Sequence, residues 1–170
     1  EQLADDGVAF AALTDHNTVE GLPAFAQALA RHEVGAVTGV EISAWHESGE
    51  VHLLGYGFDP NHSELQDVLR VLRQRDLPAN TTVHDAVRER SLFAPMAGAV
   101  AAAVANGGHL SVETAIRLIH DAGGRAFLAH PLVTETELEQ LRSLLVTLQA
   151  VGLDGIEAVY EPYAPAEQER

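Results

Sequence analysis

Side chains able to bind a metal ion follow three apolar runs of this sequence. Asp15 and His16 come after the run "VAFAALT", Glu41 ends the run "GAVTGVE", and His130 follows "RAFLA". Imidazoles and carboxylates are the ligands that zinc, manganese and iron take in proteins. If the three runs are parallel strands of an α/β sheet, their carboxyl ends lie at one edge, where functional groups gather. We therefore expect His16, Glu41 and His130 to converge on one site.

Each of these residues, taken singly, also fits a structural role. Asp15 could cap the helix that follows it, and His16 could be an ordinary turn residue. His130 precedes Pro131, and a residue before proline is held extended, so His130 could simply end its strand. Glu41 is harder to explain in this way, because a carboxylate at the end of a valine-rich strand loses its hydration unless it has a partner. The structural alternative is therefore weakest for Glu41.

A fourth candidate, His52, lies between Val51 and Leu53 in the apolar stretch "VHLLGYG". On its own it is more readily explained as a hydrogen-bonded core histidine than as a ligand. Four imidazole or carboxylate groups from four separate segments are nevertheless expected of a metal site, and a hydrophobic core needs none of them. The other histidines fall in turns or on predicted helices and are expected to have no role in the site: His32, His46, His62, His84, His109 and His120.

The composition limits the kind of site and of substrate. The chain has no cysteine, so a metal would be held by imidazole and carboxylate alone. A formal net charge of −15 argues against a broad nucleic-acid surface, whose affinity comes from clustered Lys and Arg. The one arginine cluster, Arg70, Arg73 and Arg75, is expected to be a solvated helix face. A metal ion could still supply the positive charge that a phosphorylated substrate requires.

The distribution of apolar residues predicts no membrane anchor. No apolar stretch reaches the roughly 18 to 20 residues that cross a bilayer, and the alanine-rich segment "MAGAVAAAVANGG" is short and contains glycines. Without cysteine or a signal-like N-terminus, the expected compartment is the cytoplasm. The expected partner is a small phosphorylated substrate, with nucleic acid bound at most as a short oligonucleotide, and no oligomeric state is favoured.

Apolar runs typical of buried strands alternate with segments of helical periodicity. This alternation predicts an α/β fold with one largely parallel sheet or partial barrel, because strand–helix–strand units pair their strands in parallel. Residues 63–110 have helical patterns and no strand pattern, so we predict a helical insertion there, within a barrel portion made of residues 1–62 and 111–170. The strands are predicted at 8–14, 36–41, 51–57, 125–130 and 154–160.

Five segments, in order, resemble the PHP (polymerase and histidinol phosphatase) family, and especially its stand-alone metal-dependent phosphoesterases. They are "LTDHNTVEGLPAF", "GVEIS", "HLLGYGFD", "AIRLIHDAGGRAFLAHP" and "GLDGIEAVY". The resemblance covers most of residues 1–60 and 111–160. It implies a distorted (β/α)7 barrel, similar to a TIM barrel, that holds two or three divalent metal ions, commonly Mn, Zn or Fe, and hydrolyses phosphoesters.

Motif by motif, the resemblance implies that the metal ligands are His16, Glu41, His52 and His130. It therefore favours a ligand role for His52 over the structural alternative. Glu41 and Asp15 are the expected catalytic residues. Glu41 is the ligand able to bridge two metal ions, whereas Asp15 matches no ligand of the family and is expected to orient His16.

The sequence departs from the family at both ends, where an opening HxH strand with its downstream Asp and a closing GSDxH-like segment do not occur. A complete (β/α) barrel takes about 250 residues, whereas this chain has 170 and begins at Glu1 rather than Met. We therefore expect a chain truncated at both ends.

The parent protein is expected to be a phosphoesterase that uses metal-activated water. Its substrates would be small phosphorylated metabolites or nucleotides, such as nucleoside bisphosphates or oligonucleotide ends. Because four ligands cannot fill a two- or three-metal centre, we expect the 170-residue chain to bind metal weakly and to hydrolyse phosphoesters poorly or not at all. The alternative is a truncated or degenerate, non-catalytic PHP-like scaffold or regulatory module.

Overall fold

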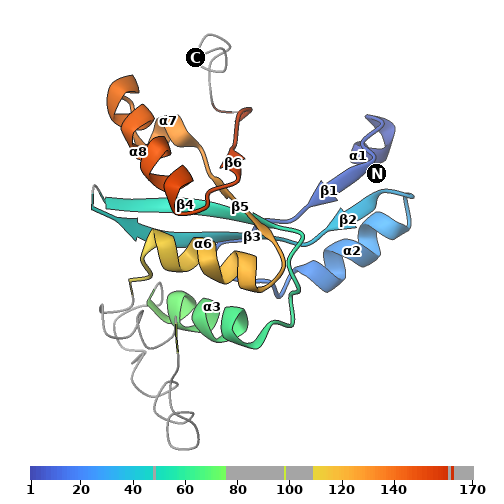
Figure 1. The fold of residues 1–170 in the computed structure, drawn as a ribbon. Helices are drawn as coiled ribbons and strands as arrows, with labels where there is room; N and C mark the ends of the chain where they lie inside the picture. The colour runs from blue at the N-terminus through green and yellow to red at the C-terminus, as the bar shows by residue number, and fades with distance from the viewer. Residues whose placement is uncertain (48, 76–97, 99–108, 161, 163–170) are drawn as a thin grey trace, which may run out of the picture.

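The computed structural model describes residues 1–47, 49–75, 98, 109–160 and 162, and its strands form two sheets (Figure 1). The larger sheet has the order β3-β4-β5-β6. Its pairs β3/β4 and β4/β5 are antiparallel, and only β5/β6 is parallel. The four strands are β3 (Gly39–His46), β4 (Gly49–Tyr56), β5 (Arg125–Leu128) and β6 (Gly155–Ile156).

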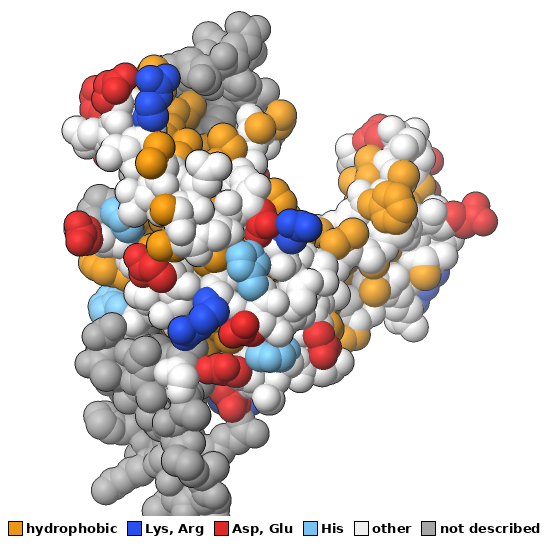
Figure 2. Space-filling model, in the orientation of Figure 1, with side chains coloured by type: hydrophobic (Ala, Val, Ile, Leu, Met, Phe, Trp, Pro, Cys, Tyr) orange, Lys and Arg blue, Asp and Glu red, His pale blue; other side chains and the backbone are white. Residues whose placement is uncertain are grey.

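The smaller sheet is a parallel pair, β1 (Phe10–Ala12) and β2 (Gly35–Val37), connected by α2 (Leu22–Ala30). With the short α1 (Gln2–Asp5), these elements form an arm beside the larger sheet (Figure 1). Leu22 and Leu29 of α2 are buried, but other apolar side chains on the arm are exposed, and Phe10 of β1 is 70% exposed (Figure 2). The arm therefore adds less to the core than the larger sheet does.

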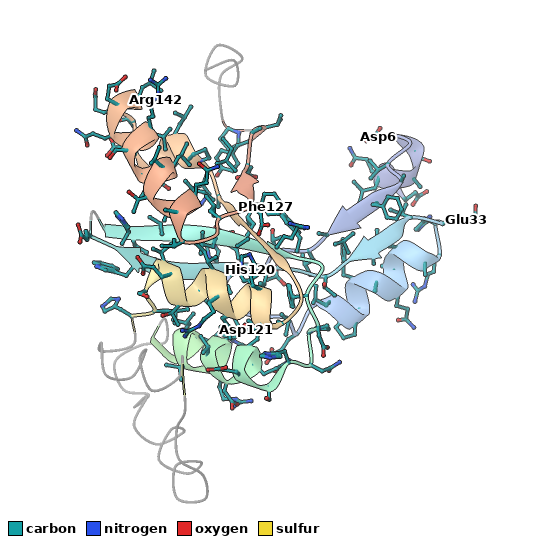
Figure 3. All side chains as sticks on the ribbon, in the orientation of Figure 1. Asp6, Glu33, His120, Asp121, Phe127 and Arg142 are labelled. Atoms are coloured by element: carbon teal, nitrogen blue, oxygen red, sulfur yellow. The ribbon has the colours of Figure 1, made fainter. Side chains whose placement is uncertain are left out.

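Helix α6 (Val112–Asp121) covers one face of the larger sheet, and α3 (Ser63–Arg75) lies beyond it (Figures 1 and 3). A Cβ atom added at Gly55 of β4 would lie 3.3 Å from Ile119 of α6, so the glycine allows the helix to approach the strand closely. The short α7 (Pro131–Thr134) and α8 (Leu138–Ala150) follow β5. Buried side chains of α3, α6 and α8 belong to one hydrophobic core with those of the sheet.

Alternate residues of β3 point to opposite faces of the sheet, as strand geometry requires. Val40 and Ile42 are fully buried in the core. Glu41 and Ser43 point to the other face, and residues opposite them on β4 share that face, so His52 joins them through its pairing with Ser43. The hydrophobic period of β3 thus determines which face carries the polar groups.

The prediction of one largely parallel sheet is wrong, because the strands lie in two sheets and the larger one is mostly antiparallel. Only two residues separate His46 from Gly49, and a connection that short forms a hairpin, whereas a parallel pair needs a crossover of a dozen residues or more. The predicted strand 36–41 is divided at Thr38, whose hydroxyl donates to the carbonyl of Phe58 at 2.7 Å. Gly39 then begins β3 in close contact with the backbone of Leu13.

The predicted helical insertion 63–110 begins with α3 as expected, but residues 76–97 and 99–108 lie outside the described residues. The division into 1–62, 63–110 and 111–170 therefore stays a prediction, and so does closure of the sheets into a barrel. The described strands and helices establish a mixed α/β fold. Across the described part of the chain, no helix has both the length and the apolar character needed to cross a membrane.

Candidate metal centre

Three imidazoles surround the carboxylate of Glu41. Its Oε1 lies 2.9 Å from His52 Nδ1 and 3.3 Å from His130 Nε2, and its Oε2 lies 3.5 Å from His16 Nε2. His52 Nδ1 and His130 Nε2 are themselves 3.1 Å apart. The structure therefore brings together all four residues that the sequence proposed as ligands.

These side chains reach the cluster differently from the expectation that each would follow the end of a strand. Glu41 is the third residue of β3, and His52 is the fourth of β4, opposite Ser43. Only His16, after β1, and His130, after β5, follow their strands. The reason is the antiparallel β3/β4 hairpin, which places mid-strand residues of both strands side by side on one face.

The segment that carries His16 is attached to β3 by backbone and side-chain hydrogen bonds. The N–H of Glu41 donates to the carbonyl of Asp15 at 3.1 Å, and the N–H of Asn17 donates to the carbonyl of Glu41 at 2.7 Å. The Asn17 side chain, only 1% exposed, accepts from the Ser43 N–H at 3.0 Å and donates to its hydroxyl at 3.2 Å. These bonds fix the backbone on either side of His16 relative to Glu41.

Sequence reasoning missed Asn17 and Ser43, although one signal was present. Asn17 has a φ of 53°, in the left-handed region that asparagine adopts more readily than most residues. An Asn directly after a candidate ligand, at the end of a strand, is compatible with such a turn. Its burial and its two bonds to Ser43 depend on β3, which is distant in sequence.

The contacts of Asp15 run to β3 and to the start of α2. Its carbonyl accepts from Glu41, and its carboxylate lies close to Gly21, where an added Cβ atom would come within 2.9 Å of Oδ2. These contacts do not include one between the Asp15 carboxylate and His16, so the role of Asp15 in orienting His16 stays a prediction.

His130 is held in a left-handed conformation, with φ 31° and ψ 59°, at the start of α7. Its N–H donates to the carboxylate Oε2 of Glu157 at 2.7 Å, and the N–H of Glu157 donates to the carbonyl of Leu128 at 2.8 Å. Glu157 follows β6 and therefore fixes the backbone of His130 from the neighbouring strand. The sequence contained Glu157 in "GLDGIEAVY" but did not show that it would reach His130.

Arg70 and Arg73, which were expected to lie on a solvated helix face, make different contacts. Arg70 forms an ion pair along α3, as such a face would. Arg73 instead reaches the segment after His16, where it donates to the Thr18 hydroxyl at 3.3 Å and pairs with Glu20. The side chain of Arg75 lies outside the described residues.

The cluster is buried on one side and open on the other. The side chain of Glu41 is 14% exposed, whereas that of His16 is 56% exposed. Burial by itself would raise the pKa of the Glu41 carboxyl group, but the hydrogen bond with His52 and the positive charge of His16 outweigh it and lower this pKa. The hydrogen bond with Glu41 raises the pKa of His52, against the effect of burial. Glu41 is thus a charged carboxylate close to solvent.

No family model matches the chain, but curated relatives do. The chain is 29% identical to a 5'-3' exoribonuclease of Haemophilus influenzae, over 89% of its own length and 68% of the relative's. It is 26% identical to a 3',5'-nucleoside bisphosphate phosphatase of Chromobacterium violaceum, over 92% of its own length and 68% of the relative's. Both relatives are named as hydrolases of phosphoester bonds.

Two solved structures are similar in fold. An amidohydrolase from Chromobacterium violaceum with bound sulfate has a TM-score of 0.70 and 25% identity, over 98% of this chain and 72% of that protein. A protein from Bifidobacterium adolescentis, assigned as a metal-dependent phosphoesterase, has a TM-score of 0.67 and 20% identity, over 99% and 73% of the two chains. At this identity the second likeness shows the fold alone. The mixed α/β fold is therefore one that solved hydrolase structures share.

The donor set of the cluster fits a divalent metal ion. One donor atom from each of His16, Glu41 and His52 lies within 4.8 Å of the others, and imidazole with carboxylate suits Zn, Mn or Fe. His130 Nδ1 is buried and has no hydrogen-bond partner among the described residues. A histidine with a purely structural role would be expected to pair that nitrogen. The nitrogen that His130 directs at the cluster is the other one, Nε2, which lies 3.3 Å from Glu41 Oε1 and 3.1 Å from His52 Nδ1.

Tyr56 also lies on the face that carries the cluster, because it follows by two positions Leu54, the residue of β4 that pairs with Glu41. Burial raises the pKa of its phenol group, and the charges of Glu157 and Glu41 raise it further. The phenol therefore stays neutral near pH 7 and can act only as a hydrogen-bond donor or acceptor.

Proposed function

We propose that this chain is a metal-dependent phosphoesterase of the PHP type that acts on nucleotides or the ends of short oligonucleotides. The observation that carries the proposal is the convergence of three imidazoles on the one carboxylate of Glu41. The names of the relatives, an exoribonuclease and a nucleoside bisphosphate phosphatase, support phosphoester cleavage in nucleotides. The net charge of −15 favours small substrates over long nucleic acid.

In this proposal His16, Glu41, His52 and His130 hold a Mn, Zn or Fe ion. A divalent ion bound there would neutralise phosphate oxygens and lower the pKa of a water molecule. Glu41 contributes a carboxylate that stays charged, with three imidazoles within 3.5 Å of its oxygens. His16, the most exposed of the four, borders the side from which substrate enters.

The test is metal-dependent hydrolysis by the chain after treatment with a chelator. Phosphate release from a nucleoside 3',5'-bisphosphate and nucleotide release from a 5'-phosphorylated dinucleotide would be measured with and without Mn²⁺, Zn²⁺ or Fe²⁺. We expect slow turnover that requires the metal, because four protein donors suffice for one ion and not for a larger centre. Calorimetry on the same samples would show whether the metal binds.

The outcome that overturns the proposal is metal binding without hydrolysis of either substrate, both by this chain and by a chain extended at both ends. That result would instead support the non-catalytic scaffold or regulatory module. Equal hydrolysis with and without metal would also contradict it, because the proposed chemistry depends on a bound ion.

A further inference from the structure

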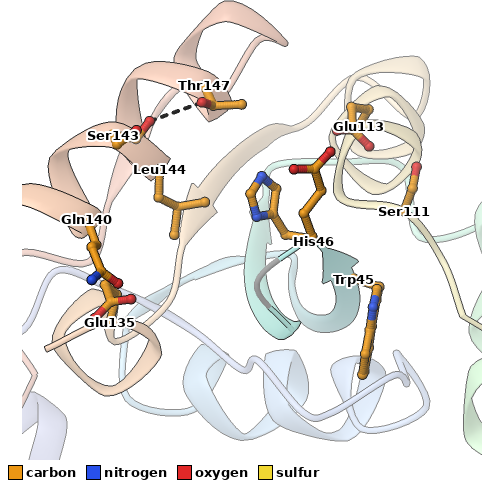
Figure 4. Close-up of a pocket in the computed structure, with 10 residues that line it drawn as sticks. Trp45, His46, Ser111, Glu113, Glu135, Gln140, Ser143, Leu144 and Thr147 are labelled. Carbon is orange, nitrogen blue, oxygen red and sulfur yellow. Dashed lines mark hydrogen bonds between the residues drawn. The ribbon is translucent and has the colours of Figure 1, made fainter. Parts of the chain in front are cut away.

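Trp45, the single tryptophan of the chain, lies on the face of the sheet that carries the candidate metal centre. It follows Glu41 and Ser43 at alternate positions of β3, and it pairs across the hairpin with Glu50, two residues before His52. Figure 4 shows the neighbouring side chain, His46, pointing to the opposite side, toward α6 and α8. Trp45 and Glu41 therefore face the same way.

The indole ring is exposed and yet held in place. It is 44% exposed, and it packs against the ring of His109 with centroids 4.6 Å apart and an interplanar angle of 52°. The N–H of Trp45 donates to the carbonyl of Leu110 at 2.7 Å, and Trp45 also forms a β-bridge with Ser111. An aromatic surface fixed in this way loses little conformational freedom when a ligand stacks on it.

The spacing along β3 indicates the size of the ligand. Four residues of a strand, at about 3.3 Å per residue, separate Glu41 from Trp45 by roughly 13 Å. A ligand with a phosphate at Glu41 and a base at Trp45 must span this distance, which favours a base from a neighbouring nucleotide over the one whose phosphate is at Glu41.

We propose that Trp45 is a stacking platform for a nucleobase of the substrate, and that the preferred substrate contains at least two nucleotides. This inference rests on the proposed function of the Glu41 cluster. Stacking suits an acidic protein because it needs no positive charge, and it tolerates any base because every base has an aromatic face. In this arrangement Trp45 determines substrate preference, and the Glu41 cluster determines the chemistry.

The single tryptophan allows a direct test by intrinsic fluorescence. A dinucleotide with a phosphorothioate linkage, which resists hydrolysis, would be titrated into the metal-loaded chain, and an abasic dinucleotide of the same charge would be the control. Stacking predicts a saturable fluorescence change with the phosphorothioate dinucleotide and no change with the abasic dinucleotide. The inference would be overturned if both ligands gave the same fluorescence change, or if neither ligand gave any change.

A second experiment compares substrates with and without a base. We expect Trp45→Ala to lower the ratio of kcat/KM for a 5'-phosphorylated dinucleotide to kcat/KM for p-nitrophenyl phosphate by about 5- to 140-fold, since stacking on one aromatic side chain contributes about 1–3 kcal/mol to binding. Trp45→Phe should restore most of the ratio. Phe10→Ala, which removes another exposed aromatic ring on β1, should leave the ratio unchanged.

The outcomes separate this inference from the function on which it rests. A ratio that Trp45→Ala does not change would contradict the stacking platform while leaving the phosphoesterase intact. Failure of both the unmodified chain and the chain extended at both ends to hydrolyse any of these substrates would contradict the proposed function instead. The fluorescence titration does not depend on turnover and would still decide whether a base binds at Trp45.

Discussion

Two clusters of acidic and histidine side chains lie on the larger sheet, and their hydrogen bonding differs. In the first, Glu41 is contacted by three imidazoles, two of which share one carboxylate oxygen. In the second, Asp154 accepts from three different donors. They are the Ala126 N–H at 2.9 Å, His120 Nε2 at 2.8 Å and Arg125 Nη1 at 2.7 Å.

The difference lies in how donors and acceptors are matched. Around Asp154, a backbone amide and a permanently charged guanidinium each supply a hydrogen to the carboxylate, so the cluster is complete without any ligand. Around Glu41, three imidazoles contact a single carboxylate, and His130 retains a buried ring nitrogen, Nδ1, with no hydrogen-bond partner in the described part of the chain. Similar residue types therefore occur in two different environments. The Asp154 carboxylate, where β5 meets β6, is satisfied by three hydrogen bonds, whereas the candidate metal centre keeps one ring nitrogen of His130 without a partner among the described residues.

The largest effect is expected for Glu41→Gln, which removes the shared charge and nearly conserves volume. Hydrolysis should fall by about 10²–10³-fold or more, as for the loss of a group that stabilises charge at a reacting centre. The melting temperature should no longer rise when metal is added, because stabilisation by a ligand requires binding to the folded state. Steady-state kinetics and thermal melts would measure both effects, with circular dichroism to verify the fold. A variant that keeps its rate would remove Glu41 from the proposed site.

The next effect concerns Glu157, which acts on the centre through the backbone of His130. Glu157→Ala should weaken metal affinity by about 10–100-fold, the usual cost of losing a group that positions a ligand. Glu157→Gln should lose much less, because its amide oxygen can still accept from the His130 N–H. Calorimetric titration of both variants with Mn²⁺ or Zn²⁺ would measure this. Equal losses in the two variants would indicate that the charge of Glu157 matters and not its hydrogen bond.

The Asp154 cluster is expected to affect stability and not metal binding. Asp154→Ala should lower the free energy of unfolding by about 1–3 kcal/mol, because it leaves the Ala126 N–H without its acceptor and removes the partner of Arg125. Denaturant unfolding would measure the change. Glu139→Ala, which removes an exposed carboxylate 3.9 Å from Arg142 on α8, is a matched control that should change stability by less than about 1 kcal/mol. Weaker metal binding in Asp154→Ala would contradict the separation of the two clusters.

The smallest effect is the pH dependence of the Asp154 contribution. Burial would raise the pKa of this carboxyl group, but the hydrogen bonds from Ala126, His120 and Arg125 outweigh it and lower the pKa below its ordinary value of 3.8. A lowered pKa in the folded state means that the contribution is complete above the ordinary value and is lost as the pH falls through the folded value. The stability difference between the unmodified chain and Asp154→Ala should therefore be constant near neutral pH and shrink below about pH 4. A difference that grows in acid would contradict this sign.

The residue types of the candidate centre were predictable from sequence because they belong to local motifs. His16, Glu41, His52 and His130 could be named from "TDH", "GVE", "HLLGY" and "AHP", since the ability to bind a metal resides in the side chain itself. The α/β class was also predictable, because apolar periodicity reflects the local need of each strand and helix to bury one face. The absence of cysteine restricted the donors to imidazole and carboxylate before any fold was known.

The direction of the strands was not predicted correctly, although the two-residue connection between His46 and Gly49 contained the information. The hairpin explains why Glu41 and His52 meet from mid-strand positions. Asn17 and Glu157 could not be assigned from sequence, because each is functional only through a partner far along the chain, Ser43 in one case and His130 in the other. The sequence by itself thus determined which groups are able to bind a metal. The tertiary structure alone decided which of them are adjacent and which polar atoms are left without a partner, because both depend on strand pairing between distant segments.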